Sequence, residues 1–256
     1  MPLADHDQVP NPDPTISGVR VAAVADLHFG RQGPERLRPL FDDISASADL
    51  LLLCGDLTDH GQPDEARALA REIGQHLRMP IVAVLGNHDH ESQQTPELMT
   101  ILRDTGVTVL DGDATEVLGI GVAGVTGFCG GFGPRALGAW GEPMIKAFVQ
   151  EAIGEALKLE TALARLTSST RIAMLHYAPV ASTVEGEPLE IYPFLGSSRL
   201  EEPLNRYPVT AVFHGHAHHG QPEGRTTRGV PVYNVSLPLL RRLTPDKAFK
   251  VLTIKA

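Results

Sequence analysis

The segment Ile81–Asp89, with the sequence IVAVLGNHD, decides the fold of this chain. It begins with five apolar residues and ends in the polar group Gly86-Asn87-His88-Asp89. A short apolar run that is bounded by turn residues predicts a buried strand. In open α/β sheets, ligands bind outside the carboxyl ends of the strands. The segment therefore predicts an α/β sheet with a functional site at the edge where this strand ends.

The same pattern of an apolar run followed by polar residues occurs four more times. The runs cover residues 21–24, 50–53, 171–175 and 209–213, and the polar groups after them are Asp26-Leu27-His28, Gly55-Asp56, His176 and Gly215-His216-Ala217-His218. If these runs are neighbouring strands, the polar groups converge in one crevice. A hydrophobic sheet gains nothing from carrying Asp, Asn and His to one edge, whereas a metal site requires them.

The available donors are carboxylates, one carboxamide and four imidazoles, with no thiolate among them. This mixture suits Mn, Fe or Zn better than Ca, Mg or an iron–sulfur cluster. Seven side chains are too many for one tetrahedral ion, but they suit two divalent or trivalent ions that share a carboxylate. Two metal ions roughly 3.5–4 Å apart stabilise both the attacking and the leaving oxygen in a displacement at phosphorus.

In these motifs the chain resembles the calcineurin-like metallophosphoesterase family, whose pattern is D-x-H, G-D, G-N-H-D/E, a lone His and G-H-x-H. Every motif is present, in order, between Asp26 and His218. The resemblance implies that one metal is held by Asp26, His28 and His218, the other by Asn87, His176 and His216, and that Asp56 bridges them. It further implies that His88 faces the scissile phosphate, where it stabilises charge or protonates the leaving group, and that Asp89 orients His88.

The remaining pattern predicts the order of the elements. Helices are expected at 36–48, 64–77, 96–105 and 142–166, and further strands at 107–110, 117–120, 121–125, 230–235 and 249–254. A four-layer α/β/β/α sandwich with two central mixed β-sheets accommodates this order and is the fold that the resemblance implies. Because the candidate ligands come from both ends of the sequence, we expect one domain over residues 19–256, after a flexible N-terminal arm at 1–18.

Net charge and cysteine content limit the kinds of molecule that the protein binds and the covalent links that it forms. The formal net charge is −9, and the only adjacent basic residues of note are Arg241 and Arg242. Binding of long nucleic acids depends on a basic surface, so such a substrate is disfavoured. Only two cysteines are present, Cys54 and Cys129, which argues against a disulfide framework. We expect Cys54 to be buried in a strand and Cys129 to be partly exposed.

The sequence also bears on location. No run approaches the roughly eighteen apolar residues that cross a bilayer, and the first eighteen residues do not have the pattern of a signal peptide. We therefore expect a cytoplasmic protein with no membrane partner. The sequence carries no signal for an oligomeric state.

Two long segments, 126–141 and 178–208, are expected to rim the metal crevice, since long loops in compact domains are commonly functional. Arg135 and Arg199 are the candidates in them for binding a distal phosphate or carboxylate. Four further histidines flank the motifs but are not expected to bind metal: His60, His90, His214 and His219. Of these, His214 is expected to pack inside its strand.

These observations predict a phosphoesterase that hydrolyses small phosphodiesters or phosphomonoesters. The expected nucleophile is a metal-bridging hydroxide, because metal binding lowers the pKa of water from about 15.7 to about 7. Two alternatives stay open: a non-catalytic metal-binding scaffold of the same fold, and a nuclease or nucleotide pyrophosphohydrolase. Related protein phosphatases usually carry Arg at the position of His60, which argues against a phosphoprotein substrate.

Overall fold

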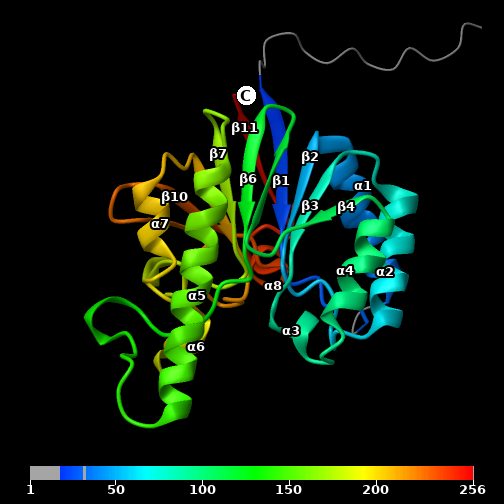
Figure 1. Ribbon diagram of the computed structural model, residues 1–256. Helices are drawn as coiled ribbons and strands as arrows, with labels where there is room; N and C mark the ends of the chain where they lie inside the picture. Colours follow the sequence, from blue (N-terminus) through cyan, green and yellow to red (C-terminus); the bar gives the residue numbers. More distant parts are fainter. Residues whose placement is uncertain (1–17, 31–32, 256) are drawn as a thin grey trace, which may run out of the picture.

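We describe residues 18–30 and 33–255 from a computed structural model. The predicted N-terminal arm at 1–18 lies outside the described residues, apart from Gly18. Two β-sheets pack face to face, and helices cover the outer face of each (Figure 1). This four-layer arrangement of helices, two mixed sheets and helices is the architecture that the sequence predicts.

The first sheet has the strand order β11-β1-β2-β3-β4. Its strands are β1 (Val19–Val24), β2 (Leu50–Cys54), β3 (Ile81–Val84), β4 (Val107–Val109) and β11 (Lys250–Ile254). The strands β1 to β4 are parallel, and β11 pairs with β1 in the antiparallel sense. Every residue of β2 and β3 is buried, which agrees with their continuous apolar sequence.

The second sheet has the strand order β5-β6-β7-β8-β10-β9. Its strands are β5 (Asp113–Val117), β6 (Ile120–Gly124), β7 (Arg171–Met174), β8 (Ala211–His214), β9 (Glu223–Arg225) and β10 (Pro231–Asn234). The four central strands are parallel, whereas β5 and β9 are antiparallel edges. Residues of β7 alternate between two hydrophobic clusters: Ile172 and Met174 pack toward the first sheet, and Ala173 packs toward the helices.

Helices cover the sheets on both outer sides. The first sheet is covered by α1 (Arg38–Ser47), α2 (Pro63–His76) and α4 (Thr95–Asp104), and the second by α5 (Pro143–Arg165) and α7 (Glu201–Arg206) (Figure 1). Three short helices complete the fold: α3 (Asn87–His90), α6 (Tyr192–Leu195) and α8 (Leu237–Leu243). None of the helices in the described ranges is long and apolar enough to cross a membrane.

Several local predictions were wrong. Residues 117–120 do not form a strand; they contain the turn of a β-hairpin between β5 and β6, in which Leu118 has a φ of 51° and Gly119 a φ of 79°. Cys129 is buried rather than partly exposed, whereas Cys54 is buried as expected. The segment 178–208 is not an irregular loop, because it contains α6 and α7.

Candidate metal centre

The polar groups predicted from sequence converge where the two sheets end. The first sheet places Asp26, His28, Asp56 and Asn87 just beyond the carboxyl ends of β1, β2 and β3, and the second places His176, His216 and His218 beyond β7 and β8. Backbone hydrogen bonds join the connecting segments: the Asp26 N–H donates to the Gly55 carbonyl at 2.9 Å, and the Gly215 N–H donates to the His176 carbonyl at 3.1 Å. Rigid strand ends therefore hold the site.

The backbone of the site is strained. Six non-glycine residues in the described part of the chain have a positive φ, and four of them are candidate ligands: Asp26 (58°), His28 (44°), Asp56 (49°) and His216 (70°). A residue with a side chain adopts this conformation only when the surroundings impose it, and such residues concentrate at functional sites. The fold thus uses backbone strain to aim these side chains.

Two of the motif glycines are required by close approach rather than by backbone conformation. A Cβ atom on Gly86 would overlap the backbone and the carboxylate of Asp56. A Cβ atom on Gly215 would lie 2.5 Å from the Cβ of Ala25 and 2.5 Å from Oδ2 of Asp26. These glycines therefore allow the motif segments to pack against the carboxylates.

The candidate ligands fall into two main groups. Donor atoms within each group lie within 4.8 Å of one another; one group is Asp26, His28 and His218, and the other is Asp56, His176 and His216. The carboxylate of Asp56 lies between them, since its Oδ1 is 3.4 Å from Nε2 of His176 and its Oδ2 is 3.8 Å from Nε2 of His28. Oδ1 of Asn87 is a further atom that could bind the metal, and it lies 2.9 Å from Nε2 of His176.

The second ring nitrogens of two histidines point at backbone carbonyls. Nδ1 of His176 lies 3.1 Å from the carbonyl of Cys54, and Nε2 of His216 lies 3.1 Å from the carbonyl of Phe194. A metal-binding histidine typically donates its other N–H to such an acceptor, which fixes the tautomer. These contacts therefore leave Nε2 of His176 and Nδ1 of His216 as the nitrogens for a metal.

Asp59 is a member of the site that the sequence reasoning missed. Its Oδ1 lies 3.3 Å from Nδ1 of His28, and Asp59, His28 and His88 form a third group of possible donors. Asp59 is buried, and it follows Asp56 in the same turn. A second buried carboxylate beside a candidate histidine is the usual arrangement for orienting a metal ligand. The repeated Asp in the stretch GDLTD is the signal that could have indicated it.

The contacts of Asp89 differ from the expectation that it orients the His88 ring. Oδ1 of Asp89 accepts hydrogen bonds from the N–H and hydroxyl of Thr58 at 2.8 and 2.6 Å. Oδ2 accepts from the N–H groups of Leu57 and Gly86 at 3.1 and 2.9 Å. The His88 ring instead places Nδ1 2.6 Å from the carbonyl of Asp59. Asp89 therefore ties the second and third motifs together through their backbone.

Burial and charge set the protonation of the site without metal. Burial disfavours the ionised form of Asp26, but the hydrogen bond from His218 and the nearby imidazoles outweigh it and lower its pKa. Burial, followed by the charges of Asp26 and Asp89, raises the pKa of Asp56. Burial, with help from His216, lowers the pKa of His176 to about 3, so this imidazole is neutral at pH 7. A neutral imidazole is the form that binds metal.

The residues present match a pair of metal ions. Both ring nitrogens of His28 are buried without a hydrogen bond, and of the two only Nδ1 has Asp59 within 3.3 Å, so a cation at Nε2 would relieve a costly buried polar atom. The donors around them are carboxylate oxygens, imidazole nitrogens and an amide oxygen, which suit Mn, Fe or Zn. Because Asp56 lies between the two groups, the arrangement accommodates two ions that share one carboxylate.

The two arginines predicted to bind substrate lie on the flanking segments. Arg199 donates to the carbonyl of Leu137 at 3.1 Å and so links segment 178–208 to segment 126–141. Arg199 also lines a hollow between α5 and α7, together with Glu160 and Glu202, rather than the pocket that contains Asn87. Arg135 lies exposed in a 3-10 turn. Arg199 thus contacts the neighbouring segment, and the substrate-binding roles predicted for Arg199 and Arg135 both stay predictions.

Of the four histidines excluded as ligands, none belongs to a donor group within the described ranges. His214 is buried at the end of β8, with Nδ1 2.8 Å from the Gly215 carbonyl and Nε2 2.8 Å from the Thr183 hydroxyl. Burial lowers the pKa of His214 to about 4. The other three make contacts nearby: His60 with Glu91, His90 with Thr95 and His219 with Arg242.

Comparison with known proteins finds one matching family and a partial relative. Residues 19–220 match the sequence model for the calcineurin-like phosphoesterase family. A probable cyclic nucleotide phosphodiesterase from Rhodococcus erythropolis is 31% identical over 83 residues, a match that covers 30% of this chain and 28% of that protein. The chain therefore aligns with less than a third of this curated relative.

Solved structures share the fold at low sequence identity. Phosphopantetheinyl hydrolase from Mycobacterium tuberculosis is similar with a TM-score of 0.68 and 16% identity, over 93% of this chain and 97% of that one. A protein from Thermus thermophilus is similar with a TM-score of 0.53 and 15% identity, over 92% of this chain and 99% of the other. At such identities the likeness concerns the arrangement of the sheets and helices.

Proposed function

This chain belongs to the calcineurin-like phosphoesterase family, and we propose that it is a dinuclear metal-dependent hydrolase of small phosphate esters. The observation that carries the proposal is the position of the Asp56 carboxylate between two groups of donors, with His88 beside it. The backbone N–H of His88 donates to Oδ1 of Asp56 at 2.9 Å, so the histidine and the bridging carboxylate are held together.

The proposed ligand sets follow the two groups. Asp26, His28 and His218 would hold one ion, while Asn87, His176 and His216 would hold the other. Asp56 would bridge them. Two such ions would supply Lewis acidity: they would lower the pKa of water and stabilise charge on the phosphoryl oxygens. Mn, Fe and Zn are the candidates, given the donors.

The chain's own contribution to proton transfer is His88. Its Nδ1 lies 2.6 Å from the carbonyl of Asp59, which is an acceptor only, so Nδ1 carries a proton and Nε2 is left for the substrate. The ring lies edge-on to His28, with centroids 4.6 Å apart, and is one-third exposed. A histidine in this position can stabilise negative charge or protonate the leaving oxygen.

A small substrate is the better candidate. The net charge of −9 argues against a long nucleic acid, whose binding depends on basic surface. The partial match to a probable cyclic nucleotide phosphodiesterase favours a small phosphodiester, although phosphomonoesters remain within the proposal. A non-catalytic scaffold is the second candidate function. It is disfavoured because a metal-binding scaffold has no use for His88, which belongs to neither proposed ligand set and has its Nδ1 held by the carbonyl of Asp59.

The proposal is tested with purified protein loaded separately with Mn, Fe and Zn. Bis-p-nitrophenyl phosphate and p-nitrophenyl phosphate serve as model diester and monoester, and release of p-nitrophenol is followed by absorbance. We expect hydrolysis of at least one ester, which is lost on chelation and in the Asp56→Ala variant. Protein that binds two ions but hydrolyses neither ester with any of the three metals would support the scaffold instead.

A further inference from the structure

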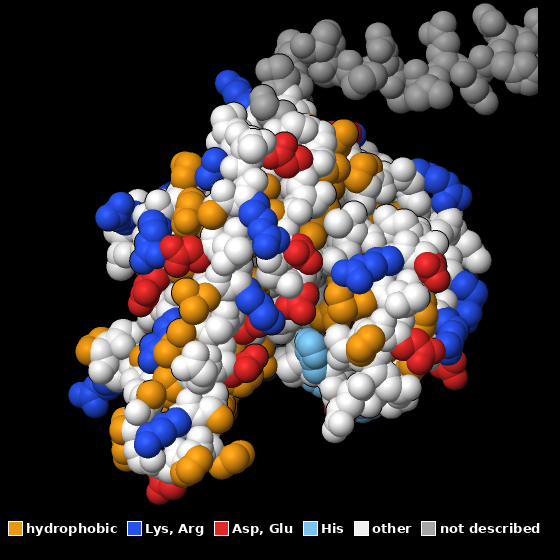
Figure 2. All heavy atoms as spheres, viewed as in Figure 1, with side chains coloured by type: hydrophobic (Ala, Val, Ile, Leu, Met, Phe, Trp, Pro, Cys, Tyr) orange, Lys and Arg blue, Asp and Glu red, His pale blue; other side chains and the backbone are white. Residues whose placement is uncertain are grey.

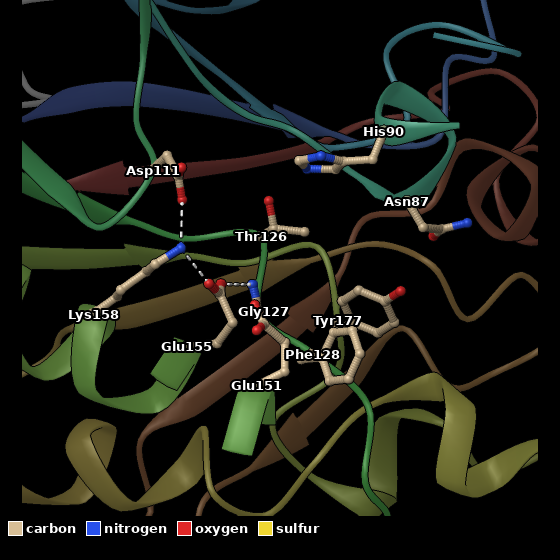
Figure 3. A pocket seen from close by; sticks show the side chains of 10 residues that line it. All are labelled: Asn87, His90, Asp111, Thr126, Gly127, Phe128, Glu151, Glu155, Lys158 and Tyr177. Atoms are coloured by element: carbon tan, nitrogen blue, oxygen red, sulfur yellow. Dashed lines mark hydrogen bonds and ion pairs between the residues drawn. The ribbon is translucent and has the colours of Figure 1, made fainter. Parts of the chain in front are cut away.

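A cavity of about 250 Å³ adjoins the proposed metal centre. It is formed by α5, by the segment after β6 and by residues next to the candidate ligands (Figure 3). Asn87 lines it directly, and so does Tyr177, which follows His176 and places its ring 4.5 Å from that of His216. In Figure 2, acidic and histidine side chains gather in the hollow between the side formed by α5 and the side formed by α2 and α4.

One wall of the cavity is aromatic. The rings of Phe128 and Tyr177 lie 6.0 Å apart at 54°, and Phe148 supports Phe128 at 5.1 Å. Tyr177 is buried and also contacts the ring of His176 edge-on at 5.5 Å. Because these rings are fixed by one another, the wall is formed before any ligand arrives. Preformed apolar walls with a few polar groups are typical of small-molecule sites.

Acidic side chains line another part of the cavity. Nζ of Lys158 lies 2.6 Å from Glu155 and 3.3 Å from Asp111, so the positive charge of this lining lysine is outnumbered by two carboxylates (Figure 3). Glu155 also accepts a hydrogen bond from the N–H of Gly127 at 2.8 Å. Glu151 is exposed, and its carboxylate has no hydrogen bond or ion pair with any part of the chain described here.

Charge and size together select the ligand. Three carboxylates and one ammonium leave the cavity with a net charge of −2 when all are ionised. At the end of the cavity away from the proposed metal ions, these carboxylates disfavour an anionic group, whereas a neutral or cationic hydrogen-bond donor can bond to Glu151. A volume of about 250 Å³ equals about eight waters at roughly 30 Å³ each, which is room for a single ring with a substituent.

We propose that this cavity binds the organic group of the phosphate ester, a ring-sized group that is neutral or cationic, and that Glu151 is a specificity-determining residue. The inference rests on the proposed function, because it assumes that the phosphate binds at the metal ions beside Asn87. The ring of the substrate packs on Phe128 and Tyr177, and its hydrogen-bond donor faces Glu151.

The test uses three p-nitrophenyl diesters whose second group is 3-(aminomethyl)phenyl, phenyl or 3-carboxyphenyl. These substrates differ in charge but share one ring size and one leaving group. For the wild type we expect kcat/KM for the ammonium ester to exceed that for the carboxylate ester by about tenfold or more. Glu151→Lys should reverse this order. Glu160→Lys is the matched control, because it changes the charge by the same two units on the same helix, at a residue that pairs with Arg206 outside this cavity, and its selectivity should equal the wild type's.

The outcomes separate the two proposals. If metal-loaded wild type hydrolyses the esters with equal kcat/KM and Glu151→Lys leaves the ratios unchanged, the cavity does not select the organic group and the inference is wrong, while the phosphoesterase function survives. If Glu160→Lys shifts the ratio as much as Glu151→Lys, the effect comes from net charge rather than from this cavity, and the inference is also wrong. If no ester is hydrolysed with any metal, the proposed function itself fails.

Discussion

The Asp89 carboxylate offers the sharpest test of how the site is built. It is buried and accepts four hydrogen bonds from Leu57, Thr58 and Gly86, which belong to two different motifs. In Asp89→Asn, one carboxylate oxygen becomes an NH₂ group that cannot accept. In either orientation of the amide, this group faces one or two buried backbone N–H donors, which lose their acceptor.

The loss of stability in Asp89→Asn follows from these contacts. Each buried donor left without an acceptor costs about 1–3 kcal/mol, and the remaining bonds weaken when the acceptor loses its charge. We therefore expect Asp89→Asn to lower the free energy of unfolding by about 2–5 kcal/mol, a large part of the roughly 5–15 kcal/mol of a typical domain. Metal affinity should fall as well, because Leu57 follows Asp56, the proposed bridging residue, and Gly86 precedes Asn87, a proposed ligand.

Urea unfolding of chelated protein, followed by circular dichroism, measures the first effect, and titration with Mn measures the second. The exposed Asp104 provides the control, since Asp104→Asn removes the same charge from the surface and should change stability by less than about 0.5 kcal/mol. If Asp89→Asn keeps wild-type stability and metal affinity but loses turnover, the carboxylate acts in the chemical step and the structural role argued here is refuted.

Three further predictions concern single residues. His88→Ala should keep both metal ions and lose about 10²–10⁴-fold in kcat; loss of metal with an unchanged rate per bound ion would contradict the assignment. Gly215→Ala should fold but bind metal at least tenfold more weakly, because the new Cβ meets Oδ2 of Asp26; wild-type affinity by titration would contradict this. The third prediction concerns His214, whose pKa is about 4 in the folded state and about 6.5 in the unfolded state. Between these two pH values the unfolded state binds a proton that the folded state does not. The free energy of unfolding therefore falls by about 3 kcal/mol as the pH drops from 6.5 to 4. Chelated His214→Gln should lose that much less stability over this window; equal slopes for the two proteins would contradict the burial of a neutral imidazole.

The sequence predicted the parts of the fold that depend on periodicity. Continuous apolar runs such as Leu50–Cys54 and Ile81–Val84 are short and are followed by turn residues, which favours strands buried on both faces over helices. The long helix expected at 142–166 is α5 (Pro143–Arg165), which has proline at its first position. The candidate metal residues could be placed at one edge for the same reason, since parallel strands end together.

What the sequence did not reveal depends on contacts between distant segments. The hairpin turn at Leu118 and Gly119 interrupts an apolar run without a proline or a polar cluster, so the run was mistaken for a strand. The hydrogen bonds of Asp89 join residues 31 and 32 positions apart, and no local pattern encodes them. The cavity beside Asn87 likewise requires α5 to pack next to the segment after β6, which periodicity does not indicate.

The central claim is that one carboxylate, Asp56, joins two metal ions. Anomalous X-ray diffraction from crystals of Mn-loaded protein, combined with metal analysis of the same sample, tests it directly. The account predicts two ions per chain, both bound to Asp56, with Asn87, His176 and His216 on one and Asp26, His28 and His218 on the other. A single ion in protein that hydrolyses phosphate esters, or two ions that do not share Asp56, would contradict it.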